Sequence, residues 1–529
     1  MCHSFEHTVQ RSVSSRSPGA GPRAFRGRLR AAALAALAAG LLVSFLPARP
    51  GSVAYVYDGA GRLVQADYGQ GKKIKYRYDA AGNLLSRKAV YELFGAHVAE
   101  TDLWWTRVAL ANPSANPAPV KLTACSDAGA ALETVDLTPL PAHGAWAGSV
   151  SALFTPETLA AMPWVLLETT VPLTGALEFG TRDNQSLAAM PLFTRSGTDL
   201  VFPYVAYAGG FYTGITLINP VTAVATVTLV ARSEAGAELA RATVTIPALG
   251  RYVQLVNGVF PTADPAAVRF VQVTADVPLA GFELFGSFTV PGLAGLSVEI
   301  PEPAVPGVPE YCLWYPEIPS PADYYTGVTL SNLGAAPAAV AFRLYDAAGA
   351  TLRDTPWPAD LQPLEQVTRN LWDLFEGVPV AGAATLQARS PQPMLGFELY
   401  LTKPEYWGQR PYVFDGMPGT AAAGLHLAFP LVKASEGWAT RLRLTNRGAS
   451  AAAFTATAYD ASGSGEWTFG GTVPAGGVTD GTVAAWFPAH AAEVAWVRID
   501  TDHALAGDAF YLSPAADRLG SYPALVLGQ

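Results

Sequence analysis

The sequence predicts an all-β protein, with four tandem β-sandwich domains preceded by a short segment of β-hairpins. Three observations support this prediction. Turn-forming residues are abundant, with 50 glycines and 42 prolines among 529 residues. Apolar and polar residues alternate at a period of two, which is typical of half-buried strands. Four sequence landmarks also recur four times in the same order at nearly equal intervals, which indicates tandem repeats.

The composition excludes two classes of protein. Hydrophobic residues make up 50% of the chain and charged residues 15%, so the chain is too apolar to be disordered. The formal net charge is −9 and no basic cluster follows the N-terminal segment. Because nucleic-acid binding needs a positive surface, we expect no nucleic-acid partner.

The N-terminus has the pattern of an export signal. Four arginines within 23–30 precede an apolar run over 31–46. The run is shorter than the ~20 residues that a membrane span needs. We therefore expect 1–48 to be a signal peptide and the mature chain to begin between Ala48 and Val53. The alternative is an uncleaved membrane anchor. No later segment is expected to span a membrane, and the predicted location is outside the cell or on its surface.

Residues 55–85 contain nearly the same motif twice. Each copy has a strand that ends in Tyr-x-Tyr-Asp, a turn that contains glycine, and a second strand that begins with Gly-x-Leu. The matched positions are Tyr57, Asp58, Gly61 and Leu63 in the first copy and Tyr78, Asp79, Gly82 and Leu84 in the second. Tyrosine favours strands and Asp-x-x-Gly favours turns, so we expect β-hairpins over 53–90.

This pair of motifs resembles the YD repeats of Rhs proteins. The resemblance implies an array whose many copies coil into a hollow shell around a toxin domain. Two copies form four short strands at most and cannot close such a shell. We therefore expect a short β-cap stacked on the following domain rather than an encapsulating structure.

The rest of the chain contains four copies of a larger unit. Each copy has a strand that starts with aromatic residues and ends in asparagine, then a glycine turn, a phenylalanine and a strand that starts with glycine. The strand-end asparagines, called the anchor asparagines below, are Asn112, Asn219, Asn332 and Asn446. The turn glycines are Gly129, Gly236, Gly349 and Gly463, the phenylalanines are Phe154, Phe260, Phe375 and Phe487, and the later glycines are Gly175, Gly281, Gly396 and Gly507.

Each copy has about seven short strands with turn signals between them, which predicts an immunoglobulin-like β-sandwich. The predicted sandwiches cover 91–198, 199–304, 308–418 and 424–529. The Cys-Trp-Cys core of antibody domains is absent, so only the architecture is predicted. Residues 301–310 read as a stiff, proline-rich linker. Together these features favour a rod or bent string of domains. Cys125 and Cys312 fall in different domains, so we expect no disulfide framework.

The alternation along the first strand of each copy assigns its side chains to two faces. Counting back from Asn219, the same face holds Leu217, Ile215 and Phe211. We therefore expect the anchor asparagines to point inward and to hydrogen-bond the following turn. On the same argument the first aromatic residue of each strand is expected in the core. These residues are Trp104, Phe211, Tyr324 and Trp438.

The second aromatic residue of each pair is expected on the opposite face. These residues are Trp105, Tyr212 and Tyr325, and the fourth copy has Ala439 in their place. Two interpretations remain open. The rings either seal contacts between neighbouring domains or bind a glycan or a protein partner.

No catalytic motif or metal-ligand spacing is present, so the sequence predicts no enzyme, no cofactor and no metal site. The histidines after the signal segment are dispersed, and Glu178, Glu283 and Glu398 do not share one position across the copies, which favours a strand-edge structural role. We therefore expect an exported structural or adhesive protein at or outside the cell surface. The alternative is a carbohydrate-binding array that uses the outward aromatic residues. A surface glycan or a protein is the expected partner.

Overall fold

The structure is a computed structural model that describes residues 53–527. Within this range it leaves out 59, 69–70, 184–185, 290–291, 299–309, 404–412, 420–422 and 514–517. The predicted signal peptide and nearly all of the predicted linker therefore lie outside the described residues. The all-β prediction is confirmed, because nearly every described element is a strand. The chain forms two compact units, Met1–Val90 and Tyr91–Gln529, which are described separately.

The first unit is an antiparallel meander whose turns depend on the aspartates of the repeated motif. Its strands are β1 (Ala54–Tyr57), β2 (Leu63–Asp67), β3 (Lys72–Tyr78) and the first part of β4 (Leu84–Gly95). The side chain of Asp58 accepts the backbone N–H of Arg62 at 2.9 Å, and Asp79 accepts that of Asn83 at 2.8 Å. Gly61 supplies the positive φ of 76° that the first turn needs. The bond from the Arg62 backbone also lowers the pKa of the Asp58 carboxyl.

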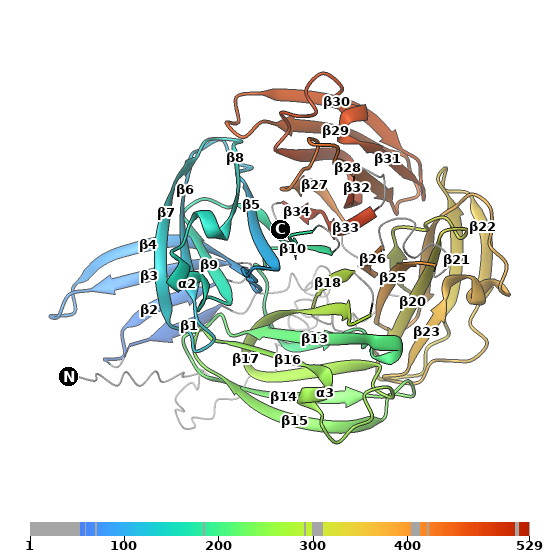
Figure 1. Cartoon of the computed structure of the whole chain (residues 1–529), viewed down its shortest axis with the longest axis horizontal. Coiled ribbons are helices and arrows are strands. Elements are labelled where there is room, and N and C mark those ends of the chain that lie inside the picture. Colours follow the sequence, from blue (N-terminus) through green and yellow to red (C-terminus); the bar gives the residue numbers. More distant parts are fainter. Residues whose placement is uncertain are drawn as a thin grey trace, which may run out of the picture. The chain divides into compact units, whose positions relative to one another are not determined.

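The second unit repeats one arrangement of eight strands four times (Figure 1). The first repeat contains the second part of β4, then β5 (Trp104–Ala111), β6 (Ala118–Cys125), β7 (Ala131–Leu140), β8 (Ala145–Ser149), β9 (Trp164–Thr169), β10 (Thr174–Thr181) and β11 (Leu187–Pro191). The second contains β12 (Gly197–Phe202), β13 (Phe211–Ile218), β14 (Ala225–Arg232), β15 (Glu238–Ile246), β16 (Arg251–Leu255), β17 (Phe270–Ser287) and β18 (Leu293–Ser297), with β17 long enough to fill two strand positions.

The other two repeats follow the same order. The third contains β19 (Tyr311–Tyr315), β20 (Tyr324–Asn332), β21 (Ala341–Asp346), β22 (Thr351–Pro356), β23 (Gln366–Asn370), β24 (Ala383–Ser390), β25 (Met394–Thr402) and β26 (Phe414–Gly419). The fourth contains β27 (Gly424–Phe429), β28 (Ala439–Asn446), β29 (Ala452–Tyr459), β30 (Glu466–Val473), β31 (Val478–Thr482), the double-length β32 (Trp496–Leu512), β33 (Arg518–Pro523) and the additional β34 (Leu525–Val526).

Helices are short and their places also repeat. A helix of three to five residues follows the fifth strand of every repeat. These helices are η1 (Val150–Ala152) and α2 (Pro156–Leu159), α3 (Val256–Val259), η3 (Leu371–Phe375) and α4 (Val483–Trp486), while η2 (Ala208–Gly210) precedes β13. The landmark phenylalanines lie at these helices with at most 5% of their surface exposed, so they are core residues. Among the described residues, no helix has the length and apolar character needed to span a membrane.

Each repeat is made of two four-stranded antiparallel sheets. The sheets that we call outer have the orders β4-β9-β6-β7, β12-β17-β14-β15, β19-β24-β21-β22 and β27-β32-β29-β30. The sheets that we call inner have the orders β11-β10-β5-β8, β18-β17-β13-β16, β26-β25-β20-β23 and β33-β32-β28-β31. An antibody constant domain divides seven strands into four and three, so the resemblance to immunoglobulin domains is one of architecture and not of strand order.

The core of each repeat lies between its two sheets, and parts of these cores continue into neighbouring repeats. Ile215, Leu229 and Val273 belong to one buried cluster of the second repeat. Ile218, on the opposite face of β13, instead belongs to the cluster of the first repeat. Both faces of β13 are therefore covered, which explains why its second half is buried at every position.

The four repeats close into a ring, so the expected rod or bent string is wrong. We call the turn between the third and fourth strands of each repeat the protruding turn, and the turn between the fourth and fifth strands the receiving turn. In every repeat the protruding turn contacts the receiving turn of the next repeat. One backbone hydrogen bond recurs at each junction. Its members are Arg251 N to Asp127 O at 2.9 Å, Gln366 N to Glu234 O at 2.8 Å, Val478 N to Ala347 O at 3.0 Å and Ala145 N to Ala461 O at 3.0 Å. The last bond joins the fourth repeat to the first and closes the ring.

The turn glycines of the sequence pattern lie at the tips of these protruding turns. Gly129 has a φ of 83°, and a Cβ atom on it would lie 2.0 Å from the backbone oxygen of Ala248 in the second repeat. Gly463 has a φ of 72°, and its Cβ would lie 2.1 Å from the oxygen of Ala142 in the first repeat. Both the backbone conformation and the close approach therefore require glycine.

Candidate functional site

The anchor asparagines hold the receiving turns in place. All four have no exposed surface. The Nδ2 of Asn219 donates to the oxygens of Ala223 at 2.6 Å and Pro247 at 2.9 Å, and its Oδ1 accepts the backbone N–H of Val221 at 3.1 Å. The backbone N–H of Asn219 donates to Gly250 in the receiving turn. The other three asparagines make the corresponding bonds, so the residues form structural clamps.

The three outward aromatic residues of the sequence pattern do not share one environment. Trp105 is half-buried, packs on the core cluster of the fourth repeat and donates its Nε1–H to Thr181 O at 3.0 Å. Tyr212 is half-buried beside Phe288, with a distance of 4.7 Å between ring centroids. Tyr325 alone of the three is well exposed, at 42%. They therefore do not form an array of equivalent aromatic sites.

The first aromatic residue of each pair is half-buried rather than buried, contrary to the expectation from alternation. Phe211 stacks on Phe414 of the third repeat with ring centroids 5.1 Å apart. The Nζ of Lys433 lies 4.5 Å from the ring centroid of Trp438 and 5.6 Å from that of Trp105. Burial is first reached at the threonine that follows each pair, and these residues are Thr106, Thr213, Thr326 and Thr440.

Buried carboxylates lie in the inner sheets, which corrects the strand-edge interpretation of Glu178, Glu283 and Glu398. All three have at most 1% of their surface exposed and lie on central strands. Glu178 forms an ion pair with Lys433 of the fourth repeat. Glu398 accepts hydrogen bonds from the Tyr400 hydroxyl and from the backbone N–H of Glu317. These carboxylates belong to the packing around the centre of the ring.

The junction between the third and fourth repeats carries a second buried charge cluster. Glu317 Oε2 accepts hydrogen bonds from Arg441 and Arg443, each at 2.8 Å. Arg443 also donates to Ala384 O at 2.8 Å. Because each partner is bonded across the junction, the cluster satisfies its own charges and offers no open site.

The histidines remain dispersed in the folded chain. His97 lies between the aromatic rings of Phe179 and Phe282, and burial together with Arg251 lowers its pKa to about 3. His143 stacks on Tyr459 with centroids 5.1 Å apart. His426, His490 and His503 each pair with a nearby carboxylate. In the part of the chain that the structure describes, no three His, Cys, Asp or Glu side chains come together as a metal site would need.

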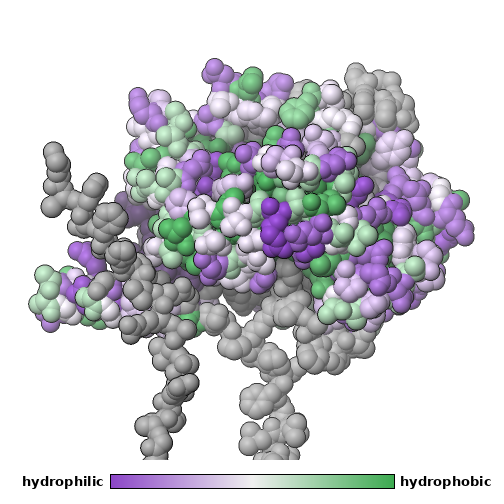
Figure 2. Space-filling view, turned by 90° about the horizontal axis from the view of Figure 1, so that it is seen from below, coloured by the Kyte–Doolittle hydropathy of each residue, from purple (hydrophilic) through white to green (hydrophobic). Residues whose placement is uncertain are grey.

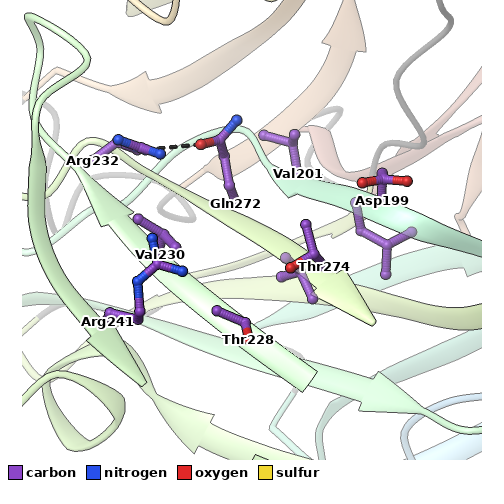
Figure 3. Close-up of a pocket in the computed structure, with 10 residues that line it drawn as sticks. Asp199, Val201, Thr228, Val230, Arg232, Arg241, Gln272 and Thr274 are labelled. Carbon is purple, nitrogen blue, oxygen red and sulfur yellow. Dashed lines mark hydrogen bonds between the residues drawn. The ribbon is translucent and has the colours of Figure 1, made fainter. Parts of the chain in front are cut away.

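A groove of about 200 Å³ lies on the outer sheet of the second repeat (Figure 3). Its lining residues are Asp199, Leu200, Val201, Thr228, Val230, Arg232, Arg241, Gln272, Val273 and Thr274. Sequence reasoning missed this groove, because no motif marks it and its residues come from four separated strands. The strand register places them in rows, which could be found only after the sheet order was known.

Two rows of cross-strand neighbours form the groove. One row runs through Val201, Gln272, Val230 and Arg241 on β12, β17, β14 and β15. The other runs through Asp199, Thr274, Thr228 and Thr243 on the same strands. Short valine and threonine side chains form the floor and long arginine side chains form one wall, so the difference in side-chain length creates the depression.

Arginine side chains give one end of the groove a positive character. Arg232 Nε donates to Gln272 Oε1 at 2.8 Å, and its Nη1 donates to Gly236 O at 3.3 Å. Arg241 forms a bidentate pair with Glu238, at 3.0 and 2.8 Å. Figure 2 looks onto this repeat from below the view of Figure 1 and shows a compact hydrophilic patch bordered by apolar side chains.

Comparisons with known proteins identify only the opening motif. Residues 57–90 match the family model of the RHS repeat, which confirms the resemblance to YD repeats. No curated protein matches the chain. Among solved structures, the serine-rich repeat protein Srr2 from Streptococcus agalactiae has 8% identity and a TM-score of 0.13, covering 47% of this chain and 85% of its own. The BSP domain of a biofilm associated protein has 9% identity and a TM-score of 0.13, covering 83% and 92%. Likenesses with such low scores carry no argument about this chain.

Proposed function

We propose that this chain is an exported structural or adhesive protein that acts at or outside the cell surface, without a catalytic centre. The observation that carries the proposal is the closed ring of four β-sandwich repeats, whose outer sheets have exposed residues on their edge strands β7, β15, β22 and β30. A ring closed by the same backbone hydrogen bond at every junction is a rigid scaffold. Weak contacts made by one rigid body add through effective concentration.

Two further observations support this role. The predicted export signal at 1–48 and the match to the RHS repeat at 57–90 precede the ring in the sequence. The buried polar clusters that are described above satisfy one another at the junctions. Their burial therefore serves assembly of the ring rather than chemistry on a substrate.

The geometry does not favour a carbohydrate-binding array that uses the outward aromatic residues. Trp105 packs on the fourth repeat, and Tyr212 is half-buried beside Phe288. Tyr325 is exposed, but a single ring does not make a repeated binding surface. Contacts between repeats therefore account better for Trp105 than a ligand does.

Fractionation and adhesion experiments test the proposal. Cells that produce the full chain are treated with an external protease, and the chain is followed by immunoblot in surface, medium and internal fractions. We expect it in the medium or in the protease-sensitive surface fraction. Purified chain coated on a plate is also expected to retain cells better than a coat of heat-denatured chain. Recovery only from the internal fraction, or equal retention by both coats, would contradict the proposal.

A further inference from the structure

We propose that the groove on the outer sheet of the second repeat binds one acidic sugar residue of a uronic-acid polysaccharide. This inference rests on the proposed surface role and names a ligand class for it. The first step of the argument is Arg232, which is half-buried at one end of the groove. Its described hydrogen bonds go to neutral oxygens of Gln272 and Gly236, while the nearby Glu238 forms its ion pair with Arg241. A guanidinium in this state is suited to a carboxylate from a ligand.

In two other repeats, the arginines on the corresponding face of the outer sheet already have carboxylate partners from the chain itself. In the fourth repeat, Asp500 takes the position of Thr274 and pairs with Arg498 at 2.8 Å and with His426 at 2.6 Å. In the third repeat, Asp354 pairs with Arg343 and with Arg389. These carboxylates neutralise the arginines of their own sheets.

In the second repeat a threonine stands where the fourth repeat has its carboxylate. Thr228 and Thr274 consequently form the floor beside Asp199, and Val230 and Gln272 lie between this row and Arg232. Asp199 lies at the opposite end, where its carboxylate accepts a bond from the Thr198 hydroxyl at 3.0 Å. The groove therefore presents a cation at one end and, at the other end, a row that contains two hydroxyl groups and an anion.

The size and chemistry of the groove indicate one unit of a polymer. Its volume of about 200 Å³ is below the ~300–1,000 Å³ that is typical of sites enclosing a whole ligand. A uronic acid would place its carboxylate at Arg232, beside the Arg241–Glu238 pair, and its hydroxyl groups at the threonines and Asp199. Because the groove is shallow and open, the rest of a polysaccharide chain can continue over the sheet.

Calorimetric titration of the full chain with trigalacturonate, and with neutral galactotriose for comparison, tests the inference. We expect trigalacturonate to bind and galactotriose to bind at least about tenfold more weakly, a difference of ~1.4 kcal/mol. Binding should also weaken with added salt, since one exposed charge pair carries much of the discrimination. Equal binding of both sugars, or no binding of trigalacturonate at millimolar concentration, would overturn the inference.

Variants locate the binding to this groove. Arg232→Gln should weaken trigalacturonate binding at least about tenfold, and Thr274→Phe should abolish it by filling the floor. Lys121→Gln is the control, because it removes one positive charge from the third strand of another repeat, at the position that Thr228 has in the second repeat. Arg241→Gln, at an exposed position, replaces Arg232→Gln if the latter lowers the melting temperature, because it leaves Glu238 free to pair with Arg232 and should weaken binding likewise. Undiminished binding by these groove variants would reject the site, whereas the fractionation and adhesion results for the proposed function would stand.

Discussion

At the scale of single residues, the anchor asparagines and two buried glutamates of this protein have structural partners. The single side chain and backbone of Asn219, at the end of its strand, form hydrogen bonds both to the loop that follows and to the receiving turn. Glu178 and Glu317 are buried, but each is paired with a cation of the fourth repeat. Removing one partner of such a group is costly because the other is left buried without a bond.

Replacing Asn219 with alanine tests the clamp. We expect Asn219→Ala to lower the free energy of unfolding by about 2–3 kcal/mol, because buried carbonyl groups of the turn lose their donor. Asn370→Ala is the control, since Asn370 caps the short helix η3 with a single described bond to Trp372 N. Its loss should cost only about 1 kcal/mol. Denaturant unfolding measures both, and equal costs would contradict the clamp.

The lowered pKa of the buried His97 predicts that the stability of the folded chain depends on pH. Its pKa is lowered from 6.5 to about 3 in the folded chain, because the ring is buried and faces Arg251. Below pH 6.5 the unfolded chain therefore binds a proton that the folded chain does not, so stability falls as the pH falls toward 3. The slope should be at most ~1.4 kcal/mol per pH unit.

The measurement compares unfolding free energies between pH 6.5 and pH 5, where most carboxylates remain ionised. The variant His97→Phe keeps an aromatic ring between Phe179 and Phe282 but cannot titrate. We expect its stability to change less over this range than that of the parent chain. Parallel pH profiles of the two proteins would mean that His97 charges in the folded state.

At the scale of elements, the protruding turns are the units that connect repeats. Each turn combines a glycine of positive φ with a close backbone approach to the neighbouring repeat. The receiving turns also contain a residue of positive φ, and these residues are His143, Leu249, Leu364 and Gly476. The same pair of turn conformations therefore forms all four junctions, which explains why the glycine landmark recurs at a constant distance from each anchor asparagine.

Gly129→Ala tests the protruding turn against a matched control. Gly382 has nearly the same φ, 80° against 83°, but a Cβ atom on it would meet nothing within 4 Å. Gly382→Ala should therefore cost only the backbone strain of about 1–2 kcal/mol. Gly129→Ala adds a clash with Ala248 and should cost at least about 1 kcal/mol more, through the lost junction hydrogen bond. Equal shifts in unfolding free energy would show that the junction does not depend on this approach.

At the scale of the second unit, closure of the ring joins its first and last repeats. Their contact includes the Ala145–Ala461 backbone bond, a bond of 2.8 Å from Trp496 Nε1 to His143 O, and the packing of Trp105 on the fourth repeat. The eighth strands of the repeats, β11, β18, β26 and β33, pack on their neighbours around the centre. Small residues such as Gly295 and Gly520 allow this approach, with Gly295 facing Met190 and Gly520 facing Leu187.

The contribution of the junction between the first and fourth repeats to stability can be measured at Trp105. Trp105→Ala should cost about 2 kcal/mol, because the half-buried indole loses apolar contact with the fourth repeat and one hydrogen bond. Tyr325→Ala, at the corresponding position of the third repeat, should change stability by less than about 0.5 kcal/mol because its ring is exposed. Limited proteolysis should be faster for the first variant. A larger effect at Tyr325 would contradict the assigned packing.

The sequence by itself determined the all-β class, the hairpin motif, the repetition and the positions of the residues that later proved to form the junctions. Local signals suffice for these features, because strand alternation and turn chemistry depend on neighbours in the chain. It also placed Asn219 at a strand end with an inward side chain. The sequence did not determine the environment of Trp105 or Phe211. Alternation assigns side chains to the two faces of a sheet, but it does not show that neighbouring repeats cover both faces.

Only the tertiary structure decided the closure of the ring, the burial of Glu178, Glu283 and Glu398, and the existence of the groove. Closure depends on a contact between the first and last repeats, which are hundreds of positions apart, and the recurring turn pattern does not say that the last repeat meets the first. The groove depends on the pairing order of β12, β17, β14 and β15, which brings Asp199, Thr274, Thr228 and Thr243 into one row. Such rows form because sheets join strands by backbone hydrogen bonds between distant segments, and one-dimensional periodicity does not specify which strands pair.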